Sequence, residues 1–284
     1  MGEREALEAR ILSQRDTEEL SRDARGLLAG QVAVITGGNG GLGLAAAAAF
    51  AREGAHLVLA ARSADALEMA AGRLRAQGVQ ALAVPTDVGR ADAIEELFAR
   101  AIEEFGQVDI LVNNAGVSGP TAPLHEISLE AWEETLAVDL TSAFLCARAA
   151  LPGMIRRGRG NILSVSSIFG KRAYPYRTPY AAAKWALIGL TQSLAHEVGR
   201  HGIRVNAICP GPIAGERIER VWRERSLRRG IPLEAIRDKM LRMAALRRIP
   251  EAGEFADLAL FLVSDLSRGM TGQAINLSAG MEMR

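Results

Sequence analysis

The chain has 284 residues, of which 49% are apolar, 5% are aromatic and 24% are charged. That length fits one large α/β domain, and a formal net charge of +1 provides no overall field that would attract nucleic acid or an anionic membrane. The two cysteines, Cys146 and Cys209, are far apart and form no CxxC pair, which excludes a disulfide framework or a zinc ribbon and fits a reducing compartment.

Residues 1–29 are polar and charged, and they predict a helical or partly ordered extension ahead of the domain that begins at Gly30. The alternative is an arm that packs on a neighbouring subunit. Because charges begin at Glu3, the segment is not a secretory signal. The longest apolar stretch, Leu42 to Ala51, is too short to cross a bilayer. We therefore expect a cytoplasmic protein that binds neither membrane nor nucleic acid.

From Gln31 onward, short apolar runs alternate with helical patterns. The predicted strands cover 32–35, 56–60, 79–84, 108–112, 161–165, 204–208 and 274–277; the predicted helices run from the glycine cluster to about Glu53 and over 63–77, 92–105, 129–156 and 179–201. This alternation indicates an α/β fold with a doubly wound parallel sheet, covered by helices on both faces, in a single domain over 30–284. The arginine-rich segment 212–250 interrupts it and is typical of a substrate lid.

A glycine cluster follows the first predicted strand and opens the first helix. Residues 36–43 read T-G-G-N-G-G-L-G, and glycines in this context allow the backbone to approach a pyrophosphate at a helix N-terminus. The alternative is that residues 36–43 form a flexible glycine loop that binds no ligand. The predicted cofactor-binding residues here are Gly37, Asn39, Gly41, Leu42 and Gly43.

The end of the second predicted strand bears on the choice of cofactor. An acidic residue there would hold the ribose 2′-hydroxyl of NAD, but the chain has Arg62 and Ser63, and no carboxylate occurs before Asp65. A guanidinium and a hydroxyl suit a 2′-phosphate. The sequence therefore predicts NADP(H), with NAD(H) as the alternative cofactor and a plain surface arginine as the alternative role of Arg62.

Tyr180 and Lys184 lie four residues apart, on one face of a predicted helix. A neighbouring ammonium and a positive nicotinamide ring both favour the phenolate form of a tyrosine. Ser167 follows an apolar strand 13 residues earlier, where its hydroxyl could hold a substrate oxygen. A Tyr-x-x-x-Lys pair alone is common on helices, but the glycine cluster and the serine spacing make it specific.

With these motifs, the segment from Gly30 to Arg284 resembles the classical short-chain dehydrogenase/reductase family. Four further segments are similar to the family pattern: Asp87-Val88 to its adenine contact, Asn113-Asn114-Ala115-Gly116 to the turn lining the ribose, Pro210-Gly211-Pro212-Ile213 to its nicotinamide-side loop, and Gly272-Gln273-Ala274 to the lead into the last strand.

The resemblance implies a Rossmann fold of about seven strands and assigns three catalytic residues. Tyr180 would be the acid/base, Lys184 the ribose contact and electrostatic helper, and Ser167 the substrate positioner. It also implies a homodimer or homotetramer formed through the helices predicted over 129–156 and 179–201. The implied cofactor-binding residues are Asp87, Val88, Asn114, Ala115, Gly116, Tyr180, Lys184, Pro210, Gly211 and Ile213.

Three positions depart from the family pattern. Asp139 stands where the family has asparagine, either as a tolerated substitution or as a sign of an altered proton relay. Gly215 stands where a threonine often bonds the cofactor carboxamide, so that contact is missing or supplied elsewhere. Ser278-Ala279-Gly280 replaces an acidic residue and two glycines, where we expect only a local effect.

We therefore expect an NADP(H)-dependent reductase of a ketone or 3-oxoacyl substrate. The alternatives are a dehydrogenase of a sugar, polyol or steroid alcohol, and a cofactor-binding regulator without turnover. Since the histidines lack metal-ligand spacing, we expect no catalytic metal. The lid arginines could attract a carboxylate or phosphorylated carrier, or could simply form i,i+4 pairs on a solvated helix: Arg217, Arg220, Arg223, Arg225, Arg228 and Arg229, against Glu216, Glu219 and Glu224.

Overall fold

The computed structural model of the chain describes residues 26–284, so most of the predicted extension over 1–29 lies outside the described residues. Seven strands form one sheet in which every pairing is parallel and the strand order is β3-β2-β1-β4-β5-β6-β7. The strands are β1 (Val32–Thr36), β2 (His56–Ala61), β3 (Ala81–Pro85), β4 (Ile110–Asn113), β5 (Gly160–Val165), β6 (Ile203–Pro210) and β7 (Ala274–Leu277). The doubly wound parallel fold is confirmed.

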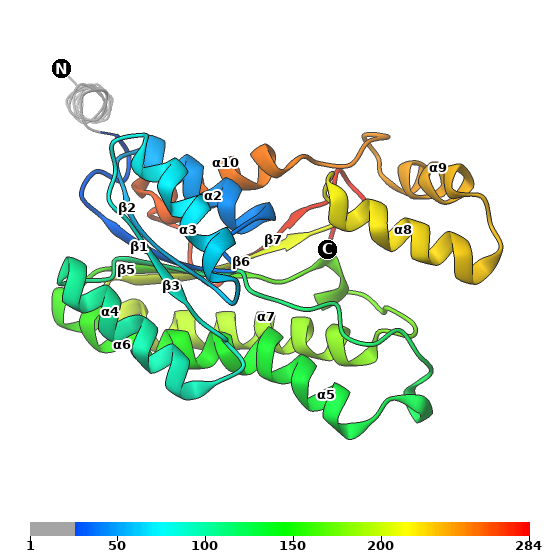
Figure 1. Cartoon of the computed structure of the whole chain (residues 1–284), viewed down its shortest axis with the longest axis horizontal. Helices are drawn as coiled ribbons and strands as arrows, with labels where there is room; N and C mark the ends of the chain where they lie inside the picture. The colour runs from blue at the N-terminus through cyan, green and yellow to red at the C-terminus, as the bar shows by residue number, and fades with distance from the viewer. Residues whose placement is uncertain (1–25) are drawn as a thin grey trace, which may run out of the picture.

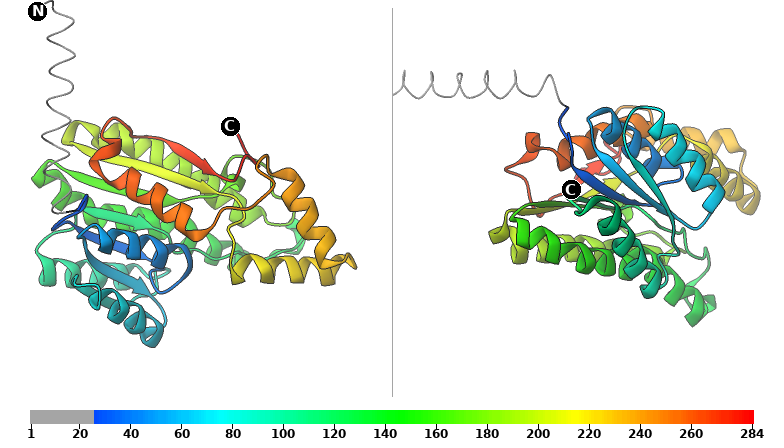
Figure 2. Two further views of the ribbon diagram at one scale, coloured as in Figure 1. Left: turned by 90° about the horizontal axis from the view of Figure 1, so that it is seen from above. Right: turned by 60° about the vertical axis from the view of Figure 1, so that its left-hand side comes forward.

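Helices cover both faces of the sheet (Figure 1). On one face lie α2 (Gly41–Arg52), α3 (Ala64–Arg75) and α10 (Ala252–Val263). On the other lie α4 (Ala91–Phe105), α5 (Leu129–Leu136), α6 (Ser142–Arg157) and α7 (Thr178–Val198). Helices α8 (Glu216–Arg229) and α9 (Leu233–Met243) extend from the body beside the carboxyl ends of the strands (Figure 2).

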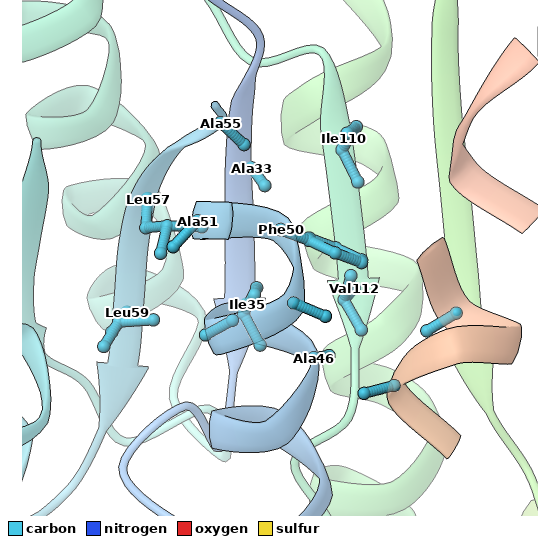
Figure 3. Close-up of a cluster of buried hydrophobic side chains, with 14 of the residues drawn as sticks. Ala33, Ile35, Ala46, Phe50, Ala51, Ala55, Leu57, Leu59, Ile110 and Val112 are labelled. Atoms are coloured by element: carbon cyan, nitrogen blue, oxygen red, sulfur yellow. The ribbon is translucent and has the colours of Figure 1, made fainter. Parts of the chain in front are cut away.

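The core has two layers because side chains alternate across the buried strands. Ala33 and Ile35 of β1 belong to the cluster under α2, α3 and α10, whereas Val32 and Val34 belong to the cluster under α4, α6 and α7. Phe50 of α2 is fully buried in the first cluster (Figure 3). With both faces covered, every residue of β1 is buried, which explains its continuous apolar run.

Leu28 shows where the chain first joins this core. Its side chain is fully buried in the first cluster, and its N–H donates to the carbonyl of Glu53 (2.9 Å). The end of the predicted extension thus packs against the turn that follows α2.

The helix predicted over 129–156 is divided by a π-helical turn, Ala137–Thr141, between α5 and α6. By length and hydropathy alone, the segment Leu129–Arg157 could cross a membrane, and 39% of its most apolar window is buried. Its buried residues include Cys146, Ala147 and Met154, which pack in the second core cluster. Burial against the sheet therefore accounts for part of its apolar character.

The structure also contains a helix that the sequence analysis does not predict. The first residues of α10 form a capping box, in which Glu251 and Glu254 bond reciprocally to backbone N–H groups. Phe255, Ala259 and Leu262 are buried in the first core cluster. Apolar residues run almost continuously through this helix, so its sequence lacks the clear amphipathic period that marks a surface helix.

Candidate active site

The predicted site residues gather at the carboxyl edge of the sheet. Parallel strands end at the same edge, and the chain reverses its order of strands between β1 and β4, which is where ligands bind in folds of this type. A cavity of about 770 Å³ opens there. It is lined by the loops after β1, β4, β5 and β6, by the start of α7, and by α8.

The glycine loop after β1 has a packed side and an open side. At Gly43 an added Cβ would lie 2.3 Å from the Gly37 carbonyl oxygen, so this position excludes a side chain. At Gly40 and Gly41 an added Cβ would meet nothing within 4 Å, and both residues line the cavity with Gly37, Asn39 and Leu42.

The N-terminus of α2 leaves its first N–H groups free for an anion. Gly40 provides no side-chain cap, and the first turn contains no acidic residue. Free N–H groups and the positive end of the helix dipole attract phosphate. The loop therefore fits the pyrophosphate of a dinucleotide.

Asn114 ties the glycine loop to the turn after β4. Its Nδ2 donates to the carbonyls of Thr36 (2.8 Å) and Gly37 (3.2 Å). The Thr36 hydroxyl in turn accepts the N–H groups of Asn114 and Ala115, each at 3.0 Å. Gly37 has a φ of +66°, and an added Cβ there would lie 2.8 Å from Asn114 Nδ2. These bonds fix two predicted cofactor loops relative to each other.

The predicted adenine-end residues lie outside the cavity lining. Arg62 and Ser63 are exposed at the end of β2, and the guanidinium of Arg62 has no ion-pair or hydrogen-bond partner among the described residues. Ser63 begins α3, yet its hydroxyl makes no capping bond. Asp87 accepts the N–H of Gly89 (3.0 Å), and Val88 is buried. Arg62 and Ser63 therefore both retain free hydrogen-bonding groups.

Ser167, Tyr180 and Lys184 line one cavity. Ser167 is buried after β5, where its Oγ accepts the N–H of Phe169 (3.2 Å). Tyr180 lies in the first turn of α7, and Lys184 Nζ is 5.6 Å from the centre of its ring. The fold therefore brings together the three residues that the sequence predicts as catalytic.

The Lys184 ammonium is fixed by groups from two other elements. Its Nζ donates to the carbonyl of Val165 (3.1 Å) at the end of β5. Asp139 Oδ1 lies 3.8 Å from the same nitrogen, and both side chains are at most 5% exposed. Ser166 strengthens this arrangement by donating its hydroxyl to the backbone carbonyl of Lys184 (2.9 Å). Neither Val165 nor Ser166 was predicted from the sequence, because Val165 acts through its backbone carbonyl and the partner of the Ser166 hydroxyl is a backbone carbonyl 18 residues away.

Asp139 occupies the π-helical turn between α5 and α6. Its Oδ1 accepts the N–H of Val117 (2.8 Å), while its Oδ2 is buried without a hydrogen-bond partner among the described residues. Burial raises the pKa of Asp139, and the nearby Lys184 charge opposes that shift only in part. An added Cβ at Gly116 would lie 2.6 Å from Asp139 Oδ1, so the glycine makes room for this carboxylate.

The loop after β6 forms the opposite wall. Pro210, Gly211 and Ile213 all line the cavity. Gly215, at the position where the family often has threonine, has a φ of +141°, a backbone conformation that favours glycine. The Ser278 hydroxyl accepts the N–H of Glu282 (3.1 Å) within its own turn. Its Cβ also lies close to Gly211, where an added Cβ would be 3.1 Å away.

Helix α8 closes the remaining side of the cavity. Trp222 of this helix packs with Ile236 and Met240 of α9 and with Ile168, forming a small third core. This apolar contact anchors the segment predicted as a lid. The side chains of Arg228 and Arg229 lie outside the described residues.

Comparison with known proteins gives consistent matches over nearly the whole described chain. Residues 37–282 match the family model described as enoyl-(acyl carrier protein) reductase. The 3-oxoacyl-(acyl-carrier-protein) reductase of Staphylococcus epidermidis is 31% identical over 252 residues, which cover 88% of this chain and 98% of that protein.

Two solved structures share the fold closely. NAD+-bound xylitol dehydrogenase superposes with a TM-score of 0.84 at 30% identity, covering 89% of this chain and 99% of that chain. A variant of actinorhodin polyketide ketoreductase with NADPH also has a TM-score of 0.84, at 32% identity, covering 88% of this chain and 97% of that chain.

Proposed function

The chain belongs to the classical short-chain dehydrogenase/reductase family and is an NAD(P)-dependent oxidoreductase of carbonyl and alcohol groups, and we propose that it acts as an NADP(H)-dependent ketone or 3-oxoacyl reductase. One observation carries the proposal: Ser167, Tyr180 and Lys184 share a cavity with the open side of the glycine loop. A small carbonyl or alcohol compound is its substrate.

The proposed chemistry needs one proton from the protein. A substrate oxygen lies between the hydroxyls of Ser167 and Tyr180, and Tyr180 gives its proton to that oxygen as the carbonyl is reduced. The first turn of α7 and the Lys184 ammonium place positive charge near the phenol, which favours the negative charge left on Tyr180. When bound, the nicotinamide supplies the hydride. In the reverse direction, Tyr180 accepts the proton of an alcohol.

Three loops would hold the cofactor. The N–H groups of Gly37 and Gly38 donate to the Ala60 carbonyl, so the N–H groups at the start of α2 are the ones that suit its pyrophosphate. The turn after β4 and the loop after β6 flank the nicotinamide end. The proposed cofactor-binding residues are Gly37, Asn39, Gly41, Leu42, Gly43, Arg62, Ser63, Asp87, Val88, Asn114, Ala115, Gly116, Tyr180, Lys184, Pro210, Gly211 and Ile213.

Substitution of Tyr180 by phenylalanine tests the catalytic assignment. It removes the hydroxyl that donates the proton, so turnover should fall by at least a hundredfold while NADPH binding, measured by fluorescence titration, stays within threefold. Tyr176→Phe is the matched control, because Tyr176 is exposed and does not line the cavity. Turnover of Tyr180→Phe within threefold of the wild type would refute the role.

A preference for NADP(H) rests on Arg62, which is exposed beside Ser63 and has no partner among residues 26–284. Substituting Arg62 by alanine should lower kcat/KM for NADPH about ten- to a hundredfold and leave that for NADH almost unchanged. Arg73→Ala is the control, since Arg73 is exposed on α3 away from the end of β2. A wild-type enzyme that prefers NADH would overturn the assignment.

Two other functional hypotheses compete with the assignment as a reductase. The similar fold of a xylitol dehydrogenase supports a polyol or other alcohol substrate, whereas the ketoreductase and the 3-oxoacyl reductase support a carbonyl substrate. A regulator without turnover would not need the three residues that line the cavity together. A panel of ketones, thioesters and alcohols, followed by NADPH absorbance, separates these readings.

The family's oligomers suggest how the exposed apolar side chains of α6 and α7 are covered. Phe144 and Trp185 are 46% and 52% exposed on these two helices, which fits a homodimer or homotetramer formed through them. Cytoplasmic localisation is likewise part of the proposal, and the two buried, free cysteines fit it. Residues 1–29 remain a proposed extension and 212–250 a proposed lid.

A further inference from the structure

The cavity wall carries an excess of positive charge that the proposed chemistry does not use. Besides Lys184, four arginines line it, against the single carboxylate of Glu216. They come from two separate elements: Arg177 precedes α7, whereas Arg217, Arg220 and Arg225 lie on α8.

Among the described side chains, none of these four guanidiniums forms an ion pair within 4 Å. Arg220 makes no i,i+4 pair with Glu216 or Glu224, although the sequence spacing allows both. The acid of α8 that does form a pair, Glu219, bonds instead to Arg237 of α9. Among the described side chains, Arg220 therefore forms none of the i,i+4 pairs of that interpretation, although it is exposed to solvent.

Two of the arginines converge on one residue. Arg177 Nη1 donates to the carbonyl oxygen of Ser118 (2.9 Å), and Arg217 Nη2 reaches to 3.5 Å from the Ser118 hydroxyl. Ser118 itself lines the cavity. The guanidinium of Arg177 also lies over the Tyr174 ring, 5.8 Å from its centre. Arg177 is thus held in place by a hydrogen bond and by a ring contact.

The surface next to this pair is aromatic. Phe169 and Tyr174 stack with their ring planes 7° apart, and Tyr174 meets Tyr180 edge to face, with ring centres 6.4 Å apart. Phe169, Tyr174 and Trp222 all line the cavity. An apolar wall therefore extends from the proposed proton donor toward the arginines.

We propose that the substrate is a keto or hydroxy acid, whose carboxylate is bound by Arg177 and Arg217 while its apolar body lies against the aromatic wall. This inference rests on the proposed function, since it assigns the far end of the same substrate. A guanidinium pairs with a carboxylate through two parallel N–H bonds. Among the described residues, neither guanidinium has a protein carboxylate within 4 Å, so both can pair with an anionic ligand.

A matched pair of ketones tests the inference: 4-oxocyclohexanecarboxylate and its neutral methyl ester, compared at saturating NADPH. The wild type should prefer the acid in kcat/KM by about ten- to a hundredfold, because the charge-assisted bonds are lost with the ester. Arg177→Met and Arg217→Met should each reduce the acid-to-ester ratio tenfold or more. Arg223→Met should keep the ratio, since Arg223 is exposed on α8 and does not line the cavity.

A binding experiment separates this inference from the proposed function. Cyclohexanecarboxylate has no reactive carbonyl, and its affinity for the enzyme with bound NADP+, measured by calorimetry, should exceed that of cyclohexanecarboxamide at least tenfold. The excess should shrink as salt rises. Turnover of neither ketone, with tight binding of cyclohexanecarboxylate, would count against the proposed function alone.

Three results would overturn the inference. The first is equal or better reduction of the ester by the wild type. The second is a preference for a neutral 3-oxoacyl thioester of N-acetylcysteamine over the acids, which would assign the arginines to a carrier group outside the reacting molecule. The third is a loss of NADPH affinity in Arg217→Met that matches its loss of acid preference, which would assign this arginine to the cofactor.

Discussion

Replacing Lys184 by methionine should destabilise the fold mainly through the carboxylate that it leaves behind. Lys184 Nζ and Asp139 Oδ1 are 3.8 Å apart, and the two side chains are 5% and 0% exposed. With an effective dielectric constant of about 20, their attraction is about 4 kcal/mol. Methionine fills a similar volume, so the substitution removes the charge while leaving little cavity.

The destabilisation should depend on pH. Burial raises the pKa of Asp139 above its ordinary value near 3.8, and Lys184 opposes that shift. In Lys184→Met the opposing charge is gone, so the pKa of Asp139 rises further. Burial of the carboxyl group therefore costs least at acidic pH, where the group is protonated. As pH rises toward 8, the folded protein must either bury a carboxylate without a counter-charge or keep a proton that the unfolded chain has released. Both cost free energy, so stability is lost progressively.

Adding Asp139→Asn should restore the stability that Lys184→Met loses. Urea unfolding of the four proteins of this cycle, followed by circular dichroism, should give a coupling free energy of about 2–4 kcal/mol at pH 8 and less at pH 5. Effects that add within about 0.5 kcal/mol at both pH values would show that the two groups do not interact in the folded protein.

Other substitutions test the packing and the backbone. Phe50→Ala should cost about 3–5 kcal/mol in urea unfolding, because the ring is fully buried; a loss under 1 kcal/mol would contradict its place in the core. Gly116→Ala should lower both the melting temperature and kcat by displacing the oxygen of Asp139, and an unchanged melting temperature would contradict this close packing. Ala279→Gly should stabilise the protein by up to ~1 kcal/mol, because Ala279 has a φ of +52°; a lower melting temperature would argue against strain there. Burial raises the pKa of Cys146 to about 12, so it should react with a thiol reagent only after unfolding, and rapid labelling of the native protein would refute that burial.

Much of the fold could be predicted because its strands are buried on both faces. Such strands appear in the sequence as short apolar runs, and the last one, Ala274–Leu277, is predicted with the same bounds that the structure shows. The glycine cluster and the Tyr180–Lys184 spacing are local features, so their positions relative to the strands and helices could also be predicted.

Other features depend on contacts between distant segments. The π-helical turn that buries Asp139 cannot be seen in a sequence that is apolar on both sides of it. Lys184 donates to the backbone carbonyl of Val165, which lies 19 residues earlier in the chain. The convergence of Arg177 and Arg217 on Ser118 brings together three separate segments, whereas the sequence shows only a charged lid.

A crystal structure of the protein with NADP+ would test the central claim most directly. The account predicts the pyrophosphate over residues 37–43 at the start of α2, the 2′-phosphate beside Arg62, and the side chains of Tyr180 and Lys184 facing the nicotinamide riboside. A glycine loop left empty while the nucleotide binds elsewhere, or a Tyr180 hydroxyl directed away from the nicotinamide, would contradict it.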